Sequence, residues 1–271
     1  MTFSIVARSE DGDSWGVAVA SKFLAVGAVV PAAVADVGAL ATQADANVAY
    51  KGLALSHLDD GATAPVALQR LLEEDPGRAD RQVGIVDVDG GAASHTGEDC
   101  IPWAGGRTGD GYAVQGNCLT GPEVVDALET AWLASDPTAP LGQRLLDALS
   151  AADEAGGDKR GRQSAALLVV RDGAGYAGGD DVDVDLRVDD HPAPVPELAR
   201  LLDLNTLYLT ASTEEEKVPV DDAVRAELEA HATAAGHPYV ATWVGTENYE
   251  MRVADDLTWV DRRILAVVRE G

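Results

Sequence analysis

The order of secondary-structure signals constrains the fold of this chain more than any other feature of its sequence. Strand-like segments, rich in β-branched residues and bounded by Gly, Asp and Asn, are separated twice by a pair of segments with helical periodicity. This order differs from the regular alternation of single strands and helices that builds a parallel sheet. We therefore expect an α+β protein in which two stacked antiparallel sheets are covered by outer helices.

The first two strand-like segments predict a hairpin at the N-terminus. Residues 2–8 and 15–22 are rich in β-branched residues, and the turn sequence Glu-Asp-Gly-Asp lies between them at residues 10–13. A terminal segment that pairs within a sheet is held in place. The hairpin therefore predicts a fixed position for Thr2, the residue after the initiator methionine.

A small C-terminal domain is expected to follow the main one. Ser212 to Val218 is polar and acidic, which predicts a boundary between a domain at residues 1–211 and a helical domain at 212–271. Trp243, Tyr249 and Trp259 are the expected core of the small domain. Within the main domain, strands are also expected at 23–30, 34–43, 82–88, 92–96, 112–115, 164–170 and 182–188, and helices at 48–58, 63–74, 120–134, 141–155 and 192–209.

The charge of the chain excludes several classes of partner. Asp and Glu outnumber Lys and Arg by 46 to 20, which gives a net charge of -26. Such a chain repels phosphate, so we expect neither nucleic acid nor an anionic membrane surface as a partner. The acidic residues are spread along the chain and lysine is scarce, a pattern typical of halophilic proteins. An ordinary acidic protein is the alternative.

Targeting segments and metal motifs are not evident. The sequence has no apolar run of membrane-spanning length and no signal-like apolar core, which favours a cytoplasmic protein. Cys100 and Cys118 are the only cysteines and are expected to be free thiols, and the five histidines lack ligand spacing. We therefore expect no metal and no cofactor. The sequence does not decide between a monomer and a homo-oligomer.

Thr2 carries the first chemical hypothesis. Its small side chain permits removal of Met1, which would leave a free α-amine beside the Thr2 hydroxyl. An α-amine with a pKa of roughly 7.7 to 8.0 is substantially neutral at neutral pH and can accept the hydroxyl proton. A threonine with its own terminal amine is a recognised substitute for a Ser-His-Asp arrangement. The alternative is that Thr2 is merely a permissive second residue.

A glycine-flanked basic loop is the second candidate feature. Residues 156–164 gather Lys159, Arg160 and Arg162 in an otherwise acidic chain, between a predicted helix and an apolar strand. Glycines let a backbone approach a ligand closely, and these cations can hold a carboxylate or a phosphate. The loop predicts an anionic substrate. A surface loop that offsets neighbouring aspartates is the alternative.

Polar residues also gather at the ends of the predicted strands. Side-chain amides or backbone N–H groups at such positions can form an oxyanion hole if they point to one place. Each residue taken singly is equally explained as a turn or cap residue. The residues in question are Asn117 and the candidate substrate-binding residues Ser21, Thr42, Gln43, Asn47 and Gln115.

Six short motifs give this chain a family resemblance. In order along the chain they are residues 2–7, 20–27, 41–43, 115–117, 156–164 and 185–191. Together they resemble the DUF1028 family, which is assigned to the N-terminal nucleophile (Ntn) hydrolase-like fold. The resemblance covers roughly residues 1 to 210, and the tail resembles the peptidoglycan-binding domain often attached to that family.

The resemblance implies a fold and a set of roles. Within the α+β class it implies a four-layered αββα sandwich, distantly like proteasome β subunits, with Thr2 as the nucleophile. Thr42 and Gln43 stand in place of the proteasome's catalytic lysine, which favours a small-molecule amidase over a protease. The implied supporting residues are Asn117 or the backbone near Gln43 for the oxyanion, Asp158 and Ser164 for the amine, and Lys159 with Arg160 for the substrate.

Two functions from different classes follow. The first is an Ntn-type hydrolase that cleaves a C–N amide-like bond of a small, anionic substrate. The second is a non-catalytic protein of the same fold that uses its C-terminal domain to recognise a ligand or partner. The state of the N-terminus distinguishes them, because the terminal-amine mechanism requires the removal of Met1.

Overall fold

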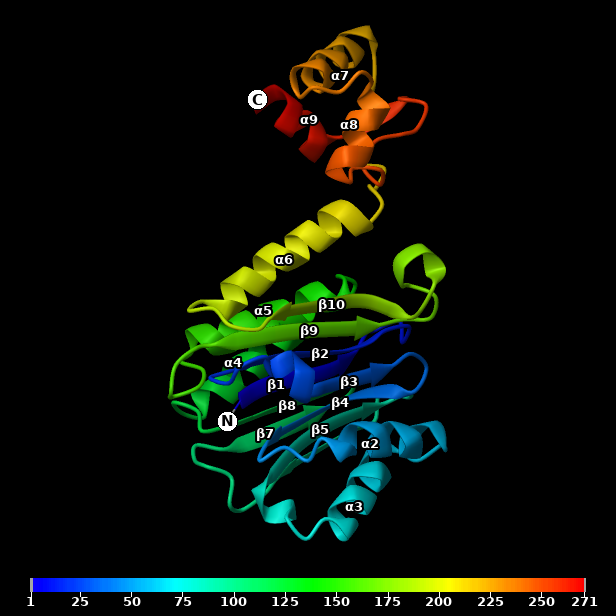
Figure 1. The fold of residues 1–271 in the computed structure, drawn as a ribbon. Coiled ribbons are helices and arrows are strands. Elements are labelled where there is room, and N and C mark those ends of the chain that lie inside the picture. The colour runs from blue at the N-terminus through cyan, green and yellow to red at the C-terminus, as the bar shows by residue number, and fades with distance from the viewer. Residues whose placement is uncertain (1, 271) are drawn as a thin grey trace. The chain divides into compact units, whose positions relative to one another are not determined.

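The computed structural model of the protein describes residues 2–270 (Figure 1). The chain forms two compact units, Met1–Leu202 and Asp203–Gly271. The division falls inside helix α6 (Pro194–Leu209), whereas the sequence places a boundary at the polar segment that begins at Ser212. A helix that runs through a division leaves no change of composition to mark it. In the described part of the chain, no helix has the length and apolar character needed to cross a membrane.

The N-terminal unit contains a six-stranded antiparallel sheet in the order β10-β9-β2-β1-β8-β7. Its strands are β1 (Thr2–Arg8), β2 (Trp15–Ser21), β7 (Gly105–Gly109), β8 (Tyr112–Asn117), β9 (Ser164–Val170) and β10 (Val182–Val188). The predicted N-terminal hairpin is confirmed, because β1 pairs with β2 along its length. Strand β1 therefore lies inside the sheet, with β2 on one side and β8 on the other.

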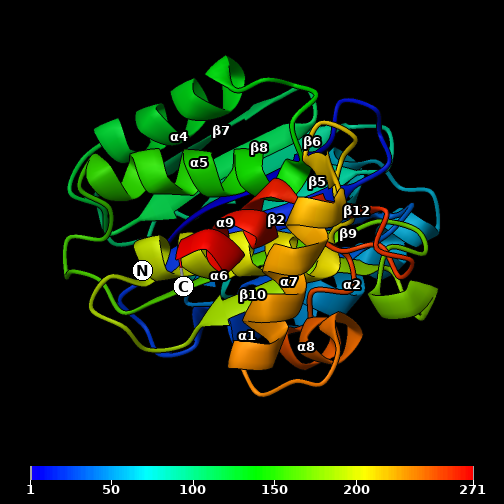
Figure 2. The ribbon, with the colours of Figure 1, turned by 90° about the horizontal axis from the view of Figure 1, so that it is seen from above.

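Helices α4 (Glu123–Ala134) and α5 (Leu141–Glu154) lie side by side over one face of this sheet (Figure 2). Alternate residues of β1, such as Phe3 and Ile5, point toward them and pack with Leu145 and Leu149 of α5. Burial of apolar side chains stabilises this layer by about 25 cal/mol per Å² of area removed from water. The other face of β1 carries Thr2, Ser4 and Val6, because side chains alternate along a strand.

A four-stranded antiparallel sheet has the order β3-β4-β5-β6. One of its faces meets the six-stranded sheet through small residues such as Val6, Val19, Ala41 and Val86. Its other face carries Leu40 and Ile85, which pack under two helices in one cluster with Tyr50 of the first helix. The strands are β3 (Pro31–Val34), β4 (Gly38–Ala44), β5 (Arg81–Asp87) and β6 (Ala92–Thr96), and the helices are α2 (Ala49–Asp59) and α3 (Ala64–Glu74).

Some predicted elements of this unit are wrong. Residues 23–30, predicted as a strand, contain the short helix α1 (Val26–Val29), which follows Ala25 in the left-handed conformation. Strand β7 was not predicted, since its sequence Gly-Gly-Arg-Thr-Gly has no run of β-branched residues. Two 3-10 turns, η1 (Arg78–Asp80) and η2 (Tyr176–Gly178), complete the unit.

The C-terminal unit combines helices with a two-stranded antiparallel sheet. Trp243 and Tyr249 lie in its core with Leu228, as predicted, but Trp259 is only half-buried and lies under the Lys217 ammonium, 4.7 Å from the ring centroid. The elements are β11 (Lys217–Pro219), α7 (Asp222–Ala234), α8 (Val240–Glu247), β12 (Trp259–Asp261) and α9 (Arg262–Glu270).

Candidate functional site

Thr2 begins β1 and lies between two polar neighbours. It pairs with Asn117 of β8, and its Oγ1 donates a hydrogen bond to the Oγ of Ser21 at the end of β2, over 3.1 Å. All three side chains are buried. The hairpin register therefore brings Thr2, Ser21 and Asn117 together, as strand-end polar groups of a single sheet.

A buried hydrogen-bond network lies next to Thr2, between the two sheets. The Gln43 amide of β4 donates to the Thr2 carbonyl over 3.3 Å and to Gln82 Oε1 over 2.8 Å, while Ser4 Oγ donates to Gln43 Oε1 over 2.7 Å. Gln115 Nε2 donates to the same Ser4 hydroxyl over 2.7 Å. Side chains from both sheets thus hold the backbone of Thr2 in place.

Gln82 of β5 is the centre of this network, although the sequence did not single it out. Its Oε1 accepts hydrogen bonds from Gln43 and from Asn117 Nδ2, the latter over 2.8 Å, and its Nε2 donates to the Gly116 carbonyl over 2.8 Å. Within residues 2–270, Asn117 Oδ1 is buried and has no donor. One N–H of the Asn117 amide also remains, because a carboxamide nitrogen carries two donors.

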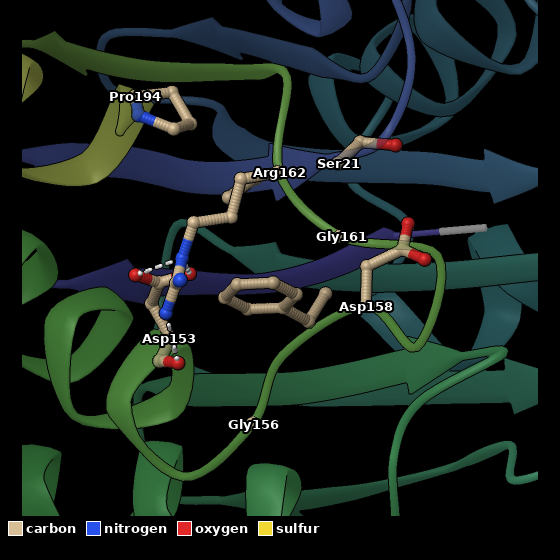
Figure 3. Close-up of a pocket in the computed structure, with 9 residues that line it drawn as sticks. Ser21, Asp153, Gly156, Asp158, Gly161, Arg162 and Pro194 are labelled. Carbon is tan, nitrogen blue, oxygen red and sulfur yellow. Dashed lines mark hydrogen bonds and ion pairs between the residues drawn. The ribbon is translucent and has the colours of Figure 1, made fainter. Parts of the chain in front are cut away.

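Asp158 lies beyond Ser21, in the loop between α5 and β9. Figure 3 shows the Ser21 hydroxyl and the Asp158 carboxylate pointing to the same side. Asp158 Oδ2 accepts from the backbone N–H of Lys22 over 3.0 Å and from Arg160 Nη2 over 2.7 Å, and Oδ1 accepts from the Arg160 N–H over 2.9 Å. The buried carboxylate therefore links the basic loop to the end of β2.

The cations of the basic loop all have partners. Arg160 pairs with Asp158, Arg162 Nε pairs with Asp153 over 2.8 Å, and Lys159 Nζ donates to the Pro102 carbonyl over 2.8 Å. A cavity of about 70 Å³ lies beside Ser21 and Asp158 (Figure 3). Since carboxylates already pair with both arginines, the loop attracts an anion less strongly than its composition suggests.

Three of the predicted site residues lie apart from the Thr2 cluster. Ser164 is opposite Ser21 in the sheet, but its hydroxyl donates to the Phe23 carbonyl over 2.5 Å and accepts from the Val26 N–H over 3.1 Å. Thr42 points to the helix-covered face, since Gln43 next to it faces β1. Its hydroxyl donates to the carbonyl of Asn47, and the Asn47 side chain donates to Asp75.

A larger cavity than the one beside Ser21 lies next to Asn117. It measures about 290 Å³ and is lined by Asn117, Cys100 and carboxylates from three loops, Asp45, Asp80 and Asp99. Burial raises the pKa of the Cys100 thiol, which keeps it protonated at neutral pH. The space for a substrate near Thr2 is therefore greater beside Asn117 than beside Ser21.

The chemistry of Thr2 depends on a residue that lies outside the described part of the chain, Met1. With Met1 removed, the α-amine and hydroxyl of Thr2 would share the strand end with Ser21 and Asn117. Groups of His, Cys, Asp or Glu suited to hold a metal ion are not found among residues 2–270.

Comparison with other proteins identifies the family. A DUF1028 protein of known crystal structure from Silicibacter pomeroyi is 33% identical, with a TM-score of 0.68, and the match covers 76% of this chain and 89% of that chain. Anbu, an ancestral beta-subunit from Yersinia bercovieri, is 12% identical with a TM-score of 0.33, over 75% of this chain and 94% of that chain. No curated protein matches. The model of the family of unknown function DUF1028 matches residues 2–198, and the chain therefore belongs to the DUF1028 family.

Proposed function

We propose that this protein is an Ntn-type amidohydrolase that cleaves a C–N amide-like bond of a small molecule, with Thr2 as the nucleophile after removal of Met1. One observation carries the proposal. The Thr2 hydroxyl is buried at the start of an inner strand, 3.1 Å from the Ser21 hydroxyl and paired in register with Asn117. A nucleophile held this rigidly loses little entropy on reaction.

The arrangement of layers supports the same proposal. Helices α4 and α5 pack on one face of the six-stranded sheet, the four-stranded sheet packs on its other face, and α2 and α3 lie beyond it (Figure 1). We take this order of layers to be the four-layered αββα sandwich of the Ntn hydrolase-like fold.

The proposed reaction uses the groups around Thr2. The α-amine of Thr2 takes the proton of Oγ1, and Oγ1 attacks the substrate carbonyl, which gives a tetrahedral oxyanion. The remaining Asn117 N–H would donate to that oxyanion. The protonated amine then gives its proton to the leaving nitrogen, and the C–N bond breaks. Water hydrolyses the Thr2 ester that results, and the free Thr2 hydroxyl is restored.

The roles of the supporting residues follow from their contacts. Ser21 accepts the Thr2 hydrogen bond and would orient the amine together with Asp158, which accepts from the Lys22 N–H. Ser164 instead fixes the chain between β2 and α1. Lys159 and Arg160 already have partners, so they support an anionic substrate only if it displaces the Pro102 carbonyl or competes with Asp158.

A non-catalytic binding protein is the second candidate. The cavity beside Ser21 measures about 70 Å³, well below the roughly 300 Å³ at which small-molecule sites begin, although the cavity beside Asn117 reaches about 290 Å³. In this case the C-terminal unit, residues 203–271, would recognise the ligand, and the resemblance of the tail indicates peptidoglycan as the first ligand to test.

The state of the N-terminus tests the first proposal directly. The intact mass of the purified protein should show the loss of Met1, and an electrophile selective for N-terminal threonine should label Thr2 and abolish amide hydrolysis. Thr2→Ala should lose activity by about 10³-fold or more while Thr2→Ser retains part of it. Thr42→Ala is the matched control. Thr42 is also a strand threonine, but it lies apart from the Thr2 cluster, on the helix-covered face of the four-stranded sheet. Complete retention of Met1 in active protein would exclude the mechanism.

A further inference from the structure

A second cavity lies at the opposite end of β1 from Thr2. It measures about 360 Å³ and is lined by Arg8, the last residue of β1, by Arg144 of α5 and by Trp132 of α4. At about 3.3 Å per residue, the strand separates Arg8 from Thr2 by roughly 20 Å. The cavity is therefore distinct from the candidate catalytic site, and nothing in the proposed reaction uses it.

Arg144 is a buried cation that forms no salt bridge among residues 2–270. Its side chain is 6% exposed, and its guanidinium lies 3.9 Å from the centroid of the Trp132 ring. Nε donates to Ser135 Oγ over 2.8 Å and Nη1 reaches the Pro137 carbonyl over 3.4 Å, both neutral acceptors. Within the described chain, Nη2 has no hydrogen-bond acceptor, and Glu10 and Asp136 act on this guanidinium electrostatically without forming a salt bridge.

Arg8 is the second unpaired cation in the cavity. Its Nε is buried without an acceptor among residues 2–270, and its guanidinium lies 5.7 Å from the centroid of the Trp15 ring. Gly90, with a φ of +87°, borders the Arg8 Nη1 and contributes no side chain to the wall. The left-handed conformation favours glycine there and keeps the space beside the guanidinium open.

Leaving a buried guanidinium group without a salt bridge is costly. A buried charge is stable only when a partner of opposite charge and hydrogen bonds compensate for lost hydration. Arg252, also buried, has such a partner in Asp261 at 2.8 Å, and Arg81 has one in Asp75 at 2.9 Å. Burial lowers the pKa of Arg144, and the negative charges of Glu10 and Asp136 offset only part of this effect. An anion bound between Arg144 and Arg8 would complete this partial compensation.

We propose that the cavity binds a small oxyanion, a carboxylate or a phosphate group, between the guanidinium groups of Arg144 and Arg8. Both groups present planar N–H donors that match the oxygens of such an anion. Glu10 and Asp110, two exposed carboxylates, also line the cavity. They disfavour a highly charged ligand such as a polyphosphate, so the ligand carries a single anionic group.

Calorimetric titration of the full chain with sodium acetate and with sodium phosphate, at constant ionic strength, tests this proposal. We expect saturable binding of one of the two anions, with a stoichiometry of one. Stronger binding of acetate assigns the site to a carboxylate ligand, and stronger binding of phosphate assigns it to a phosphate group. Equal, unsaturable heats for both anions would overturn the proposal.

Three variants connect the binding to the cavity. Arg144→Gln and Arg8→Gln should each weaken the anion at least 10-fold, and Arg144→Lys should also weaken it, because lysine keeps the charge but loses the planar donors. Arg200→Gln removes an exposed arginine that pairs with Glu197, and should leave binding unchanged. If Arg144→Gln does not fold, Arg8→Gln decides the outcome. Binding that is equal in the wild type and Arg8→Gln would place the anion elsewhere and refute the assignment.

Discussion

Asp75 accepts hydrogen bonds from four residues and organises the loop before β5. Arg81 Nε, Tyr50 OH and Asn47 Nδ2 donate to Oδ2 over 2.9, 2.7 and 3.1 Å, and the Gly77 N–H donates to Oδ1 over 2.7 Å. The hydrogen bond from Arg81 is the largest of the effects that hold the pKa of Asp75 far below its ordinary value. Asn47, predicted as a substrate ligand, thus has a structural partner.

Replacing Asp75 by Asn should destabilise the protein in a pH-dependent way. A hydrogen bond to a charged group contributes about 1.5–3 kcal/mol, so the variant should lose about 2 kcal/mol or more at pH 7. Because the folded-state pKa is depressed, the contribution of the carboxylate is fully present above the unfolded pKa of about 3.9 and is lost as the pH falls below it. The difference between the variant and the wild type should therefore shrink from pH 5 to pH 3, as measured by urea unfolding.

An exposed carboxylate provides the control. Asp172 is exposed, and the same Asp→Asn change there alters the net charge equally without removing a buried hydrogen bond. Asp172→Asn should show the wild-type pH dependence. A difference between Asp75→Asn and the wild type that stays constant down to pH 3 would contradict the assigned pKa direction.

At the scale of the elements, the helices and strands that could be predicted were those with clear local signals in the sequence. Periodicity and turn residues predicted the hairpin at β1 and β2, and so placed Thr2 and Ser21 correctly at a strand end. The same signals failed for residues 23–30, where a left-handed Ala25 starts a short helix instead of a strand. Gln82 was missed although it begins the predicted strand 82–88, because only the stacking of two sheets brings it to Gln43 and Asn117.

The stacking of the sheets provides a test of the Gln82 network. Gln82→Leu keeps the side-chain volume but leaves the amides of Gln43 and Asn117 without their shared acceptor. Each buried group left unsatisfied costs about 1–3 kcal/mol, so we expect a loss of about 3 kcal/mol in the free energy of unfolding. Gln69→Leu removes only the exposed hydrogen bond to Glu73 and should change stability by less than about 0.5 kcal/mol. Equal urea midpoints for the two variants would show that water or rearrangement replaces the network.

At the scale of the whole molecule, the charge of -26 opposes folding. Arginine–carboxylate pairs such as Arg107 with Glu129 and Arg269 with Glu227 offset part of this repulsion, but 20 cations cannot neutralise 46 carboxylates. Salt screens both the general repulsion between carboxylates and the attraction within these ion pairs. Exposed pairs contribute only about 0–1 kcal/mol each, so their loss should be smaller than the relief of the general repulsion.

Stability should therefore rise with salt, as the predicted halophilic character requires. The screening length falls from about 10 Å at 0.1 M to about 3 Å at 1 M. A gain of about 2 kcal/mol would correspond to a rise of roughly 4–8 °C in melting temperature for a domain the size of the N-terminal unit. Circular dichroism melts from 0.1 M to 2 M KCl should show this rise, and sucrose at equal osmolality should do much less, because exclusion of sucrose from the surface does not screen charge. A flat or falling melting temperature in KCl would contradict the halophilic interpretation. The acidic residues would then be those of an ordinary acidic protein, whose charge serves solubility.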